Sequence, residues 1–197
     1  MADDARRAIL ERLRGAHAPD VPAPDLSKLG ASFPDRAAKL ADSVAAVAGA
    51  LVRVPDAAAL AGEVRALAEK LGAQRVFSAV PGVAGDVSLD ALADPHEMEG
   101  IGLAVLAGAF AVAENGAVWL PTSGLKHRGV FVVTEHLALV VAADAIVNDM
   151  HEAYRRIAFP AAGFGTFISG PSKTADIEQA LVIGAHGART CTVFLVG

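Results

Sequence analysis

The sequence predicts an α/β fold with a mainly parallel sheet covered by helices. Segments expected to be strands alternate along the chain with segments of helical periodicity, which is typical of parallel sheets. Several expected strands are largely apolar, among them 137–143, which is apolar without interruption, and 191–197, as in strands that are buried on both faces. Hydrophobic residues make up 53% of the chain, and their richness in alanine favours close packing of helices on a sheet.

The first part of the chain is expected to divide at residue 35. Residues 3–14 have the pattern of an amphipathic helix, and residues 15–30 contain three prolines and little periodicity, which indicates an extended linker. Residues 1–35 are therefore predicted to be a helix and linker, and residues 36–197 the α/β domain.

Within the domain, each element is predicted from its periodicity and from the residues that bound it. Asp56 begins a helix that Gly72 ends, and Trp119 and Tyr154 are expected in the core. The other expected helices are 35–49, a short one near 88–93, 144–157 and 174–184. The expected strands are 50–54, 75–80, 102–108, 116–120, 130–133, 137–143, 165–170 and 191–197.

Composition excludes several functions. The net charge is −5 and basic residues do not cluster, so neither nucleic acid nor an anionic membrane is an expected partner. One cysteine, Cys191, excludes a disulfide framework and a cysteine-rich metal or iron–sulfur site supplied by this chain alone. With no secretory signal and no apolar run of membrane-spanning length, a cytoplasmic protein is expected. The apolar content fits self-association as well as a packed core.

The segment "GTFISGPSKT" (165–174) is the first candidate site. It is not a Walker A loop, because Pro171 and Ser172 separate the glycine from Lys173. A looser anion site is an alternative, with N–H groups at a helix start and the hydroxyls of Ser172 and Thr174. Another alternative is a plain strand–turn–helix connection with Thr174 as the N-cap.

A second candidate is the turn Glu114-Asn115-Gly116. Glu114 follows an apolar run, and a partly buried carboxyl group there would have a raised pKa suited to acid–base or nucleophilic work. The alternative is a solvent-facing turn residue beside Asn-Gly.

The histidines match no metal signature, and neither does the segment "PHEME" (95–99) with His96, Glu97 and Glu99. His136 and His186 are outside candidates for the rim of a cleft at the end of the sheet. No dinucleotide fingerprint occurs, so we expect this chain to bind neither a metal nor another cofactor.

The long segment "SGPSKTADIEQALVIGAHG" resembles the signature of the LUD-domain family, and within it the lactate utilisation protein C group. The resemblance covers roughly residues 36–197. The upstream "GAFAVAENGAVWL" is similar to the family's Ala-Glu-Thr-Gly-Thr segment, with Asn115 and Ala117 in place of two threonines.

The resemblance implies a three-layer fold like that of the NagB/RpiA/CoA-transferase proteins. It also implies a role in oxidising L-lactate to pyruvate alongside iron–sulfur partner proteins. In this interpretation Glu114 is the catalytic or ligand-orienting carboxylate, and Asp176 fixes the loop of the binding site. The residues expected to hold a small carboxylate or related anion are Asn115, Gly116, Ser169, Gly170, Ser172 and Thr174.

Two other functions stay open. One is a non-catalytic assembly or regulatory protein for the iron–sulfur subunits, with the N-terminal helix and linker as a tether. The other is an acyl- or phosphate-handling enzyme, which rests on fold analogy alone. Whether this chain is itself an enzyme is left open by its sequence.

Overall fold

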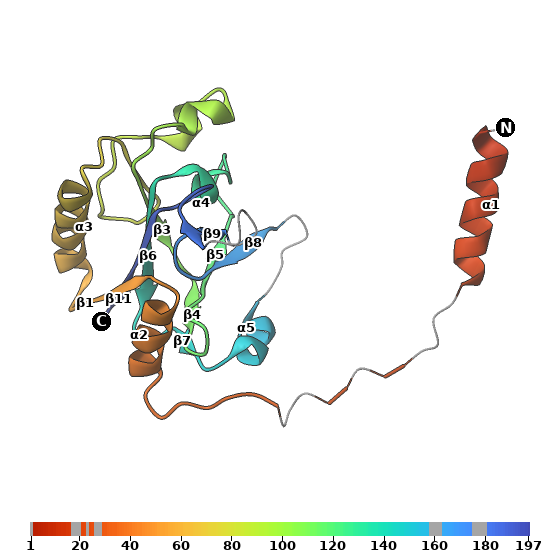
Figure 1. Cartoon of the computed structure of the whole chain (residues 1–197), viewed down its shortest axis with the longest axis horizontal. Coiled ribbons are helices and arrows are strands. Elements are labelled where there is room, and N and C mark those ends of the chain that lie inside the picture. Colours follow the sequence, from red (N-terminus) through yellow and green to blue (C-terminus); the bar gives the residue numbers. More distant parts are fainter. Residues whose placement is uncertain (1, 17–20, 23, 26–28, 158–162, 175–180) are drawn as a thin grey trace.

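The structure is a computed structural model that describes residues 2–16, 21–22, 24–25, 29–157, 163–174 and 181–197. Helix α1 (Ala2–Gly15) stands apart from the rest of the molecule (Figure 1). The expected N-terminal helix is therefore confirmed. All of its residues with a described burial are exposed.

A five-stranded parallel sheet forms the centre of the molecule, in the order β1-β11-β6-β3-β2. It confirms the predicted α/β class and the mainly parallel sheet. Its strands are β1 (Ala50–Val54), β2 (Val76–Ser78), β3 (Leu103–Ala107), β6 (His136–Ala142) and β11 (Thr190–Val196). The last strand of the chain lies inside the sheet, where Thr190 is in register with His136 of β6.

Two helices begin where the sequence predicts them, and one of them also ends there. In α3 (Ala57–Leu71) the Asp56 carboxylate accepts a hydrogen bond from the N–H of Ala59 over 2.8 Å, and Gly72 ends the helix with φ 66°. In α2 (Arg36–Ala46) Asp35 is the N-cap, but the helix ends before the predicted residue 49. Short 3-10 helices are η1 (Leu89–Ala91) and η2 (Pro95–Met98). Within the described residues, no helix combines the length and apolar character needed to cross a membrane.

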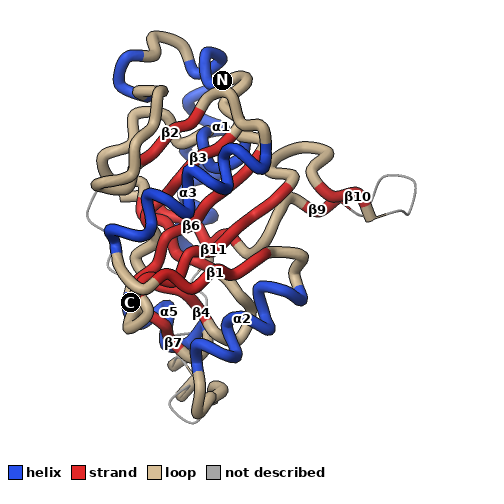
Figure 2. Tube along the Cα trace, turned by 90° about the vertical axis from the view of Figure 1, so that its left-hand side faces the viewer, coloured by secondary structure: helices blue, strands red, loops and turns tan. Residues whose placement is uncertain are grey.

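The two faces of the central sheet are covered differently. Along β3, Leu103 and Val105 belong to the same buried cluster as Leu60 and Val64 of α3, which crosses that face in Figure 2. The alternate residues point to the other face, because neighbouring side chains of a strand alternate. There the buried cluster includes residues of α2 and of a second sheet.

The second sheet has the order β7-β4-β5-β8. Its strands are β4 (Phe110–Val112), β5 (Val118–Pro121), β7 (Ile146–Val147) and β8 (Gly165–Ile168). Strand β5 is antiparallel to both of its neighbours. The ring of Trp119 lies 4.7 Å from that of Phe167, and Phe110 packs against both, so the expected core position of Trp119 is confirmed.

Three predictions were wrong in the middle of the chain. Residues 130–133, expected to be a strand, form the one-turn helix α4 (Val130–Val133). The helix expected over 144–157 is only α5 (Met150–Arg156), because Ile146 and Val147 pair with β4 and Asp149 caps the helix after them. Tyr154 was expected in the core and is instead 64% exposed.

The helix expected over Thr174–Gly184 is also wrong at both of its described ends. Strand β9 (Lys173–Thr174) pairs antiparallel with β10 (Val182–Ile183), and this ribbon projects from the body in Figure 2. Thr174 is therefore a strand residue and not an N-cap. The rest of the expected helix, residues 175–180, lies outside the described residues.

Candidate functional site

The corner Ser169–Ser172 follows β8 and turns the chain toward the ribbon. Gly170 has φ 72°, which favours glycine, and a β-carbon there would collide with the carbonyl oxygen of Val47. Lys173 donates hydrogen bonds to three carbonyl oxygens, including that of Val47 over 3.0 Å. The ammonium group of Lys173 therefore holds the corner against the end of α2.

Ser172 connects this corner to the segment that enters β11. Its N–H donates to the carbonyl oxygen of Ala188 over 2.8 Å, and its hydroxyl donates to that of His186 over 3.1 Å. Its own carbonyl oxygen accepts from Gly184. Ser172 and the predicted rim residue His186 are therefore neighbours.

The two segments on which the sequence analysis depends lie side by side. The Ser169 hydroxyl donates a hydrogen bond of 2.8 Å to the carbonyl oxygen of Asn115. Asn115 also accepts a hydrogen bond from Ala117 through its side chain. Gly116, with φ 71°, packs against the backbone of Ser43 and Val44 in α2.

Glu114 is exposed, so the expected partial burial of its carboxyl group is wrong. The apolar residues before it belong to β4, which is buried, whereas Glu114 lies beyond the end of that strand. One carboxylate oxygen accepts a hydrogen bond of 3.1 Å from the N–H of Met150, the first residue of α5. In this structure the Glu114 side chain therefore caps the beginning of α5.

A cavity of about 550 Å³ borders the corner Ser169–Ser172. It is lined by Ser169, Gly170 and Ser172 of the predicted site and by His186, but not by Glu114, Asn115, Gly116 or Thr174. Its remaining walls are mostly apolar and come from α4, β8 and the start of β6. The structure thus divides the predicted site residues between two flanks of one corner, and Asp176 falls outside the described residues.

Arg128 is a lining residue that the sequence analysis missed. Its guanidinium group lies 5.1 Å from the centre of the Phe164 ring at the cavity. No Asp or Glu is among the described residues that line this cavity. No carboxylate of the described residues forms an ion pair with Arg128. The only sequence signal was a basic residue in the loop "GLKHRG" directly before an apolar run.

The cavity lies toward the amino ends of the central strands. Leu137 near the start of β6 and Ala188 just before β11 both line it. Parallel sheets usually bind ligands at the carboxyl ends of their strands. The corner does not lie at that edge, because it follows β8, which belongs to the second sheet.

A second cavity of about 360 Å³ lies at the carboxyl ends of β2 and β3. Its lining includes Ser78, Ala107 and Ser123 and, among the described residues, no charged side chain. It is therefore less suited to a carboxylate than the first cavity. Phe131 of α4 lines both cavities.

His136 does not line either cavity. Its Nδ1 lies 2.9 Å from the Thr190 hydroxyl, and its Nε2 lies 3.9 Å from a carboxylate oxygen of Glu135. Burial lowers the pKa of His136, and the nearby Glu135 carboxylate partly opposes that shift. The imidazole therefore lies between β6 and β11, away from both cavities.

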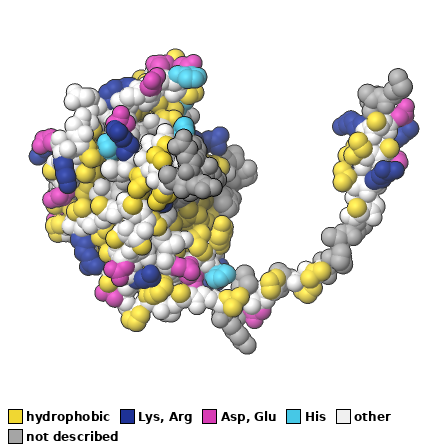
Figure 3. Space-filling view, in the orientation of Figure 1, with side chains coloured by type: hydrophobic (Ala, Val, Ile, Leu, Met, Phe, Trp, Pro, Cys, Tyr) yellow, Lys and Arg dark blue, Asp and Glu magenta, His cyan; other side chains and the backbone are white. Residues whose placement is uncertain are grey.

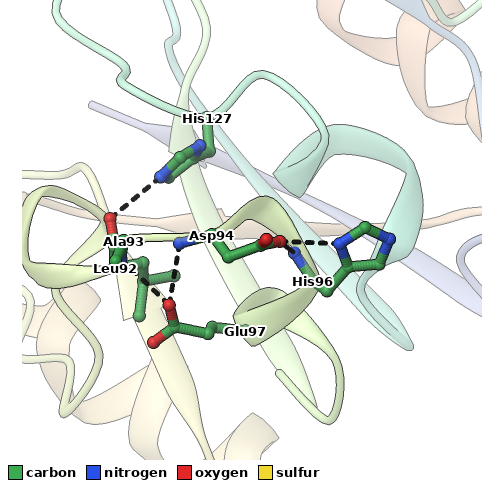
Figure 4. Close-up of polar contacts among 6 residues, drawn as sticks. All are labelled: Leu92, Ala93, Asp94, His96, Glu97 and His127. Carbon is green, nitrogen blue, oxygen red and sulfur yellow. Dashed lines mark hydrogen bonds and ion pairs between the residues drawn. The ribbon is translucent and has the colours of Figure 1, made fainter.

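The segment around His96 forms a helix cap instead of a metal site (Figure 4). Asp94 accepts from the N–H of His96, and Glu97 accepts from the N–H groups of Ala93 and Asp94. The hydrogen bond from the His96 N–H is the main reason that the pKa of Asp94 is lowered. Across the described part of the chain, no three His, Cys, Asp or Glu side chains gather closely enough to hold a metal ion.

Comparison with known proteins identifies related sequences and one related structure. The lactate utilization protein C of Deinococcus radiodurans is 32% identical over 143 residues, which cover 67% of this chain and 68% of that protein. A crystal structure of a DUF162 family protein from Deinococcus radiodurans superposes with a TM-score of 0.62 at 22% identity, covering 85% of this chain and 99% of that one. This structural likeness shows that the fold is shared.

Two further relatives match over shorter segments. The lactate utilization protein C of Shouchella clausii is 38% identical over 82 residues, and that of Halalkalibacterium halodurans is 33% identical over 91. These matches cover 39% and 43% of this chain but only 35% and 40% of those proteins. The family described as LUD domain matches residues 101–196. The chain therefore belongs to the LUD-domain family, together with the proteins named lactate utilization protein C.

Proposed function

We propose that this protein is a subunit of an L-lactate utilisation system, which oxidises L-lactate to pyruvate together with iron–sulfur partner proteins. The name of its relatives, lactate utilization protein C, supports a role in lactate utilisation. The oxidation releases two electrons and two protons. Because the chain has one cysteine, which is buried, clusters that accept these electrons would be bound by the partners.

The proposed ligand of the first cavity is a small carboxylate such as lactate or pyruvate. The observation that carries this proposal is the Arg128 guanidinium group at an otherwise largely apolar cavity, where none of the described lining residues is an Asp or Glu. A guanidinium group binds a carboxylate through two parallel hydrogen bonds, and apolar surroundings strengthen that attraction. Ser172 and His186 are the polar side chains proposed to orient the rest of the ligand.

Glu114 stays a predicted catalytic residue. Its carboxylate accepts a hydrogen bond from Met150 of α5. Ser169, which lines the cavity, is bonded to the next residue of the turn, Asn115. Any action on the cavity ligand would therefore require a substrate that extends past the corner, or a partner that covers both flanks. Glu114→Gln keeps an oxygen that accepts from Met150 and removes the carboxylate, so it separates the capping role from an acid–base role.

The binding proposal is tested by calorimetric titration of the purified chain with L-lactate and with pyruvate. Arg128→Gln should weaken binding by roughly 10- to 100-fold, because hydrogen bonds to charged groups contribute about 1.5–3 kcal/mol. Arg65→Gln, an exposed substitution on α3, is the matched control and should leave binding unchanged. Equal affinities for Arg128→Gln and the wild-type protein would show that the cavity is not the carboxylate site.

The exposed helix α1 favours a second candidate function, a non-catalytic assembly protein for the iron–sulfur subunits. Lactate-dependent reduction should be measured with the chain alone, with the partners alone, and with both. Turnover by the isolated chain would exclude the assembly function. If only the mixture is active, loss of activity in Glu114→Gln with unchanged carboxylate binding would support a catalytic role, and full activity would contradict it.

A further inference from the structure

The lining of the first cavity changes from charged to apolar with depth. Among the described lining residues, the two that can carry a positive charge, Arg128 and His186, are exposed, and we call them the rim. Charged and histidine side chains also lie scattered over the outside of the body in Figure 3. Phe131, Leu137 and Ala188 are at most 5% exposed, and we call them the floor. A ligand that enters therefore meets a guanidinium group first and apolar side chains further in.

Backbone contacts hold the walls of this cavity together. The N–H of Ser172 donates a hydrogen bond of 2.8 Å to the carbonyl oxygen of Ala188. Between them, a β-carbon on Gly187 would lie 3.1 Å from that of Ser172 and 3.3 Å from the carbonyl oxygen of Val132 in α4. The corner, the segment before β11 and α4 therefore touch one another around the cavity. A cavity with such walls needs little ordering when a ligand binds.

The cavity is much larger than L-lactate. Lactate has six non-hydrogen atoms, which would fill about 180 Å³ even if each took the ~30 Å³ that a water molecule occupies in the liquid. Since the cavity has a volume of about 550 Å³, roughly two thirds of it would be left to water beside largely apolar walls. Replacing such poorly held water with an apolar group strengthens binding.

We propose that the first cavity binds 2-hydroxy acids whose apolar side chain is longer than the methyl group of lactate. The carboxylate would lie at Arg128, and the side chain would point toward the floor. This orientation follows from the order of the lining, because a carboxylate at the floor would lose its hydration without gaining a charged partner. The inference rests on the carboxylate binding proposed for Arg128 and adds the class of acid that the cavity selects.

A series of acids with increasing chain length tests this inference on the wild-type protein. The purified chain is titrated by calorimetry with L-lactate and with the L-enantiomers of 2-hydroxybutanoate, 2-hydroxyhexanoate and 2-hydroxyoctanoate. Each buried methylene group should strengthen binding by about two- to fourfold, so 2-hydroxyoctanoate should bind at least about 30-fold more tightly than L-lactate. Affinities that stay within about threefold across the series would overturn the inference and leave the proposed lactate site standing.

Two substitutions test the two ends of the ligand separately. Ala188→Val fills part of the floor and should lower the ratio of the 2-hydroxyoctanoate affinity to the L-lactate affinity by at least about fivefold. Val132→Asp adds a carboxylate at an exposed lining position, so it should weaken both acids by a similar factor and keep that ratio. Ala58→Val, at an exposed position of α3, is the matched control and should change neither affinity.

The inference and the carboxylate site on which it rests fail in different ways. If Arg128→Gln leaves the affinity of every acid unchanged, the carboxylate site is wrong, and the inferred orientation is wrong with it. If Arg128→Gln weakens every acid but Ala188→Val has the same affinity ratio as the wild-type protein, the carboxylate site stands and the inference is overturned. A lowered ratio in Ala188→Val, together with weaker binding of every acid in Arg128→Gln, would support both.

Discussion

Ser169 and Asn115, 54 positions apart in sequence, are joined by a hydrogen bond of 2.8 Å from the serine hydroxyl to the asparagine carbonyl oxygen. The bond connects the end of β8 to the turn between β4 and β5. Both strands of that turn lie in the second sheet, and the turn itself packs on α2 through Gly116. This contact therefore links the candidate site to the packing of the second sheet against the rest of the body.

Ser169→Ala should destabilise the protein by about 1 kcal/mol, because it removes one partly buried hydrogen bond and leaves the Asn115 carbonyl oxygen without that donor. Urea denaturation measures the change. Ser172→Ala removes a longer bond of 3.1 Å at a more exposed place, and we expect a smaller loss of stability from it. An equal or larger loss in Ser172→Ala would show that the Ser169 bond is not the main connection.

Gly170→Ala should cost more than 2 kcal/mol of unfolding free energy. The backbone of Gly170 is left-handed, and a β-carbon would meet the carbonyl oxygen of Val47, which Lys173 already holds in place. Gly62→Ala is a matched control within α3, where a β-carbon meets nothing within 4 Å, and it should stabilise by about 0.5–1 kcal/mol. A neutral effect of Gly170→Ala would mean that the corner can move away from α2.

The sequence predicted those parts of the fold in which local signals agree with the final contacts. Asp56 and Gly72 bound α3 as expected, and the long, largely apolar runs became β6 and β11. Predictions were wrong where distant pairing decides the structure. Residues 146–147 extend the helical pattern of α5, but they pair with β4, more than 30 residues earlier. A run of four apolar residues at 130–133 was too short to distinguish a strand from one turn of helix.

The site was predictable only where the resemblance to a known family placed two segments together. The hydrogen bond between Ser169 and Asn115 fits that expectation. No local pattern indicated that Glu114 would point toward α5, since this depends on where Met150 lies in the folded chain. Arg128 was missed because a single basic residue in a loop is usually solvated, and its cavity is formed by segments from α4, β8 and the entry to β11.

The Asp149 carboxylate should make the stability of the protein depend on acid pH. Hydrogen bonds from the N–H groups of Glu152 and Ala31 lower the pKa of Asp149 in the folded state, whereas the unfolded value is about 3.9. The stabilisation is therefore present above about pH 4 and is lost as the pH falls through the lower folded pKa. Hydrogen bonds from the backbone and side chain of Asn148 lower the pKa of Glu152 in the same way.

Asp149→Asn retains a side chain that can cap α5 but removes the titrating group. At pH 7 this variant should be less stable than the wild-type protein by about 1 kcal/mol, and the difference should shrink below pH 4. Urea denaturation between pH 3 and pH 7 measures both effects. A difference that stays constant over this range would assign the loss to altered packing and not to the charge.

Phe131 should set the size of the ligand that the first cavity accepts, because its buried ring lines both cavities. Removing the ring in Phe131→Ala should cost about 3–5 kcal/mol and open the wall between the two spaces. Phe131→Leu keeps most of the apolar contact, and we expect it to cost less than about 2 kcal/mol and to leave a folded protein that can be tested. If the cavity binds carboxylates through Arg128, Phe131→Leu should improve the affinity for longer 2-hydroxy acids relative to L-lactate, as measured by calorimetry. An unchanged preference for chain length, in a variant with normal stability and normal lactate affinity, would show that ligands do not reach the Phe131 ring.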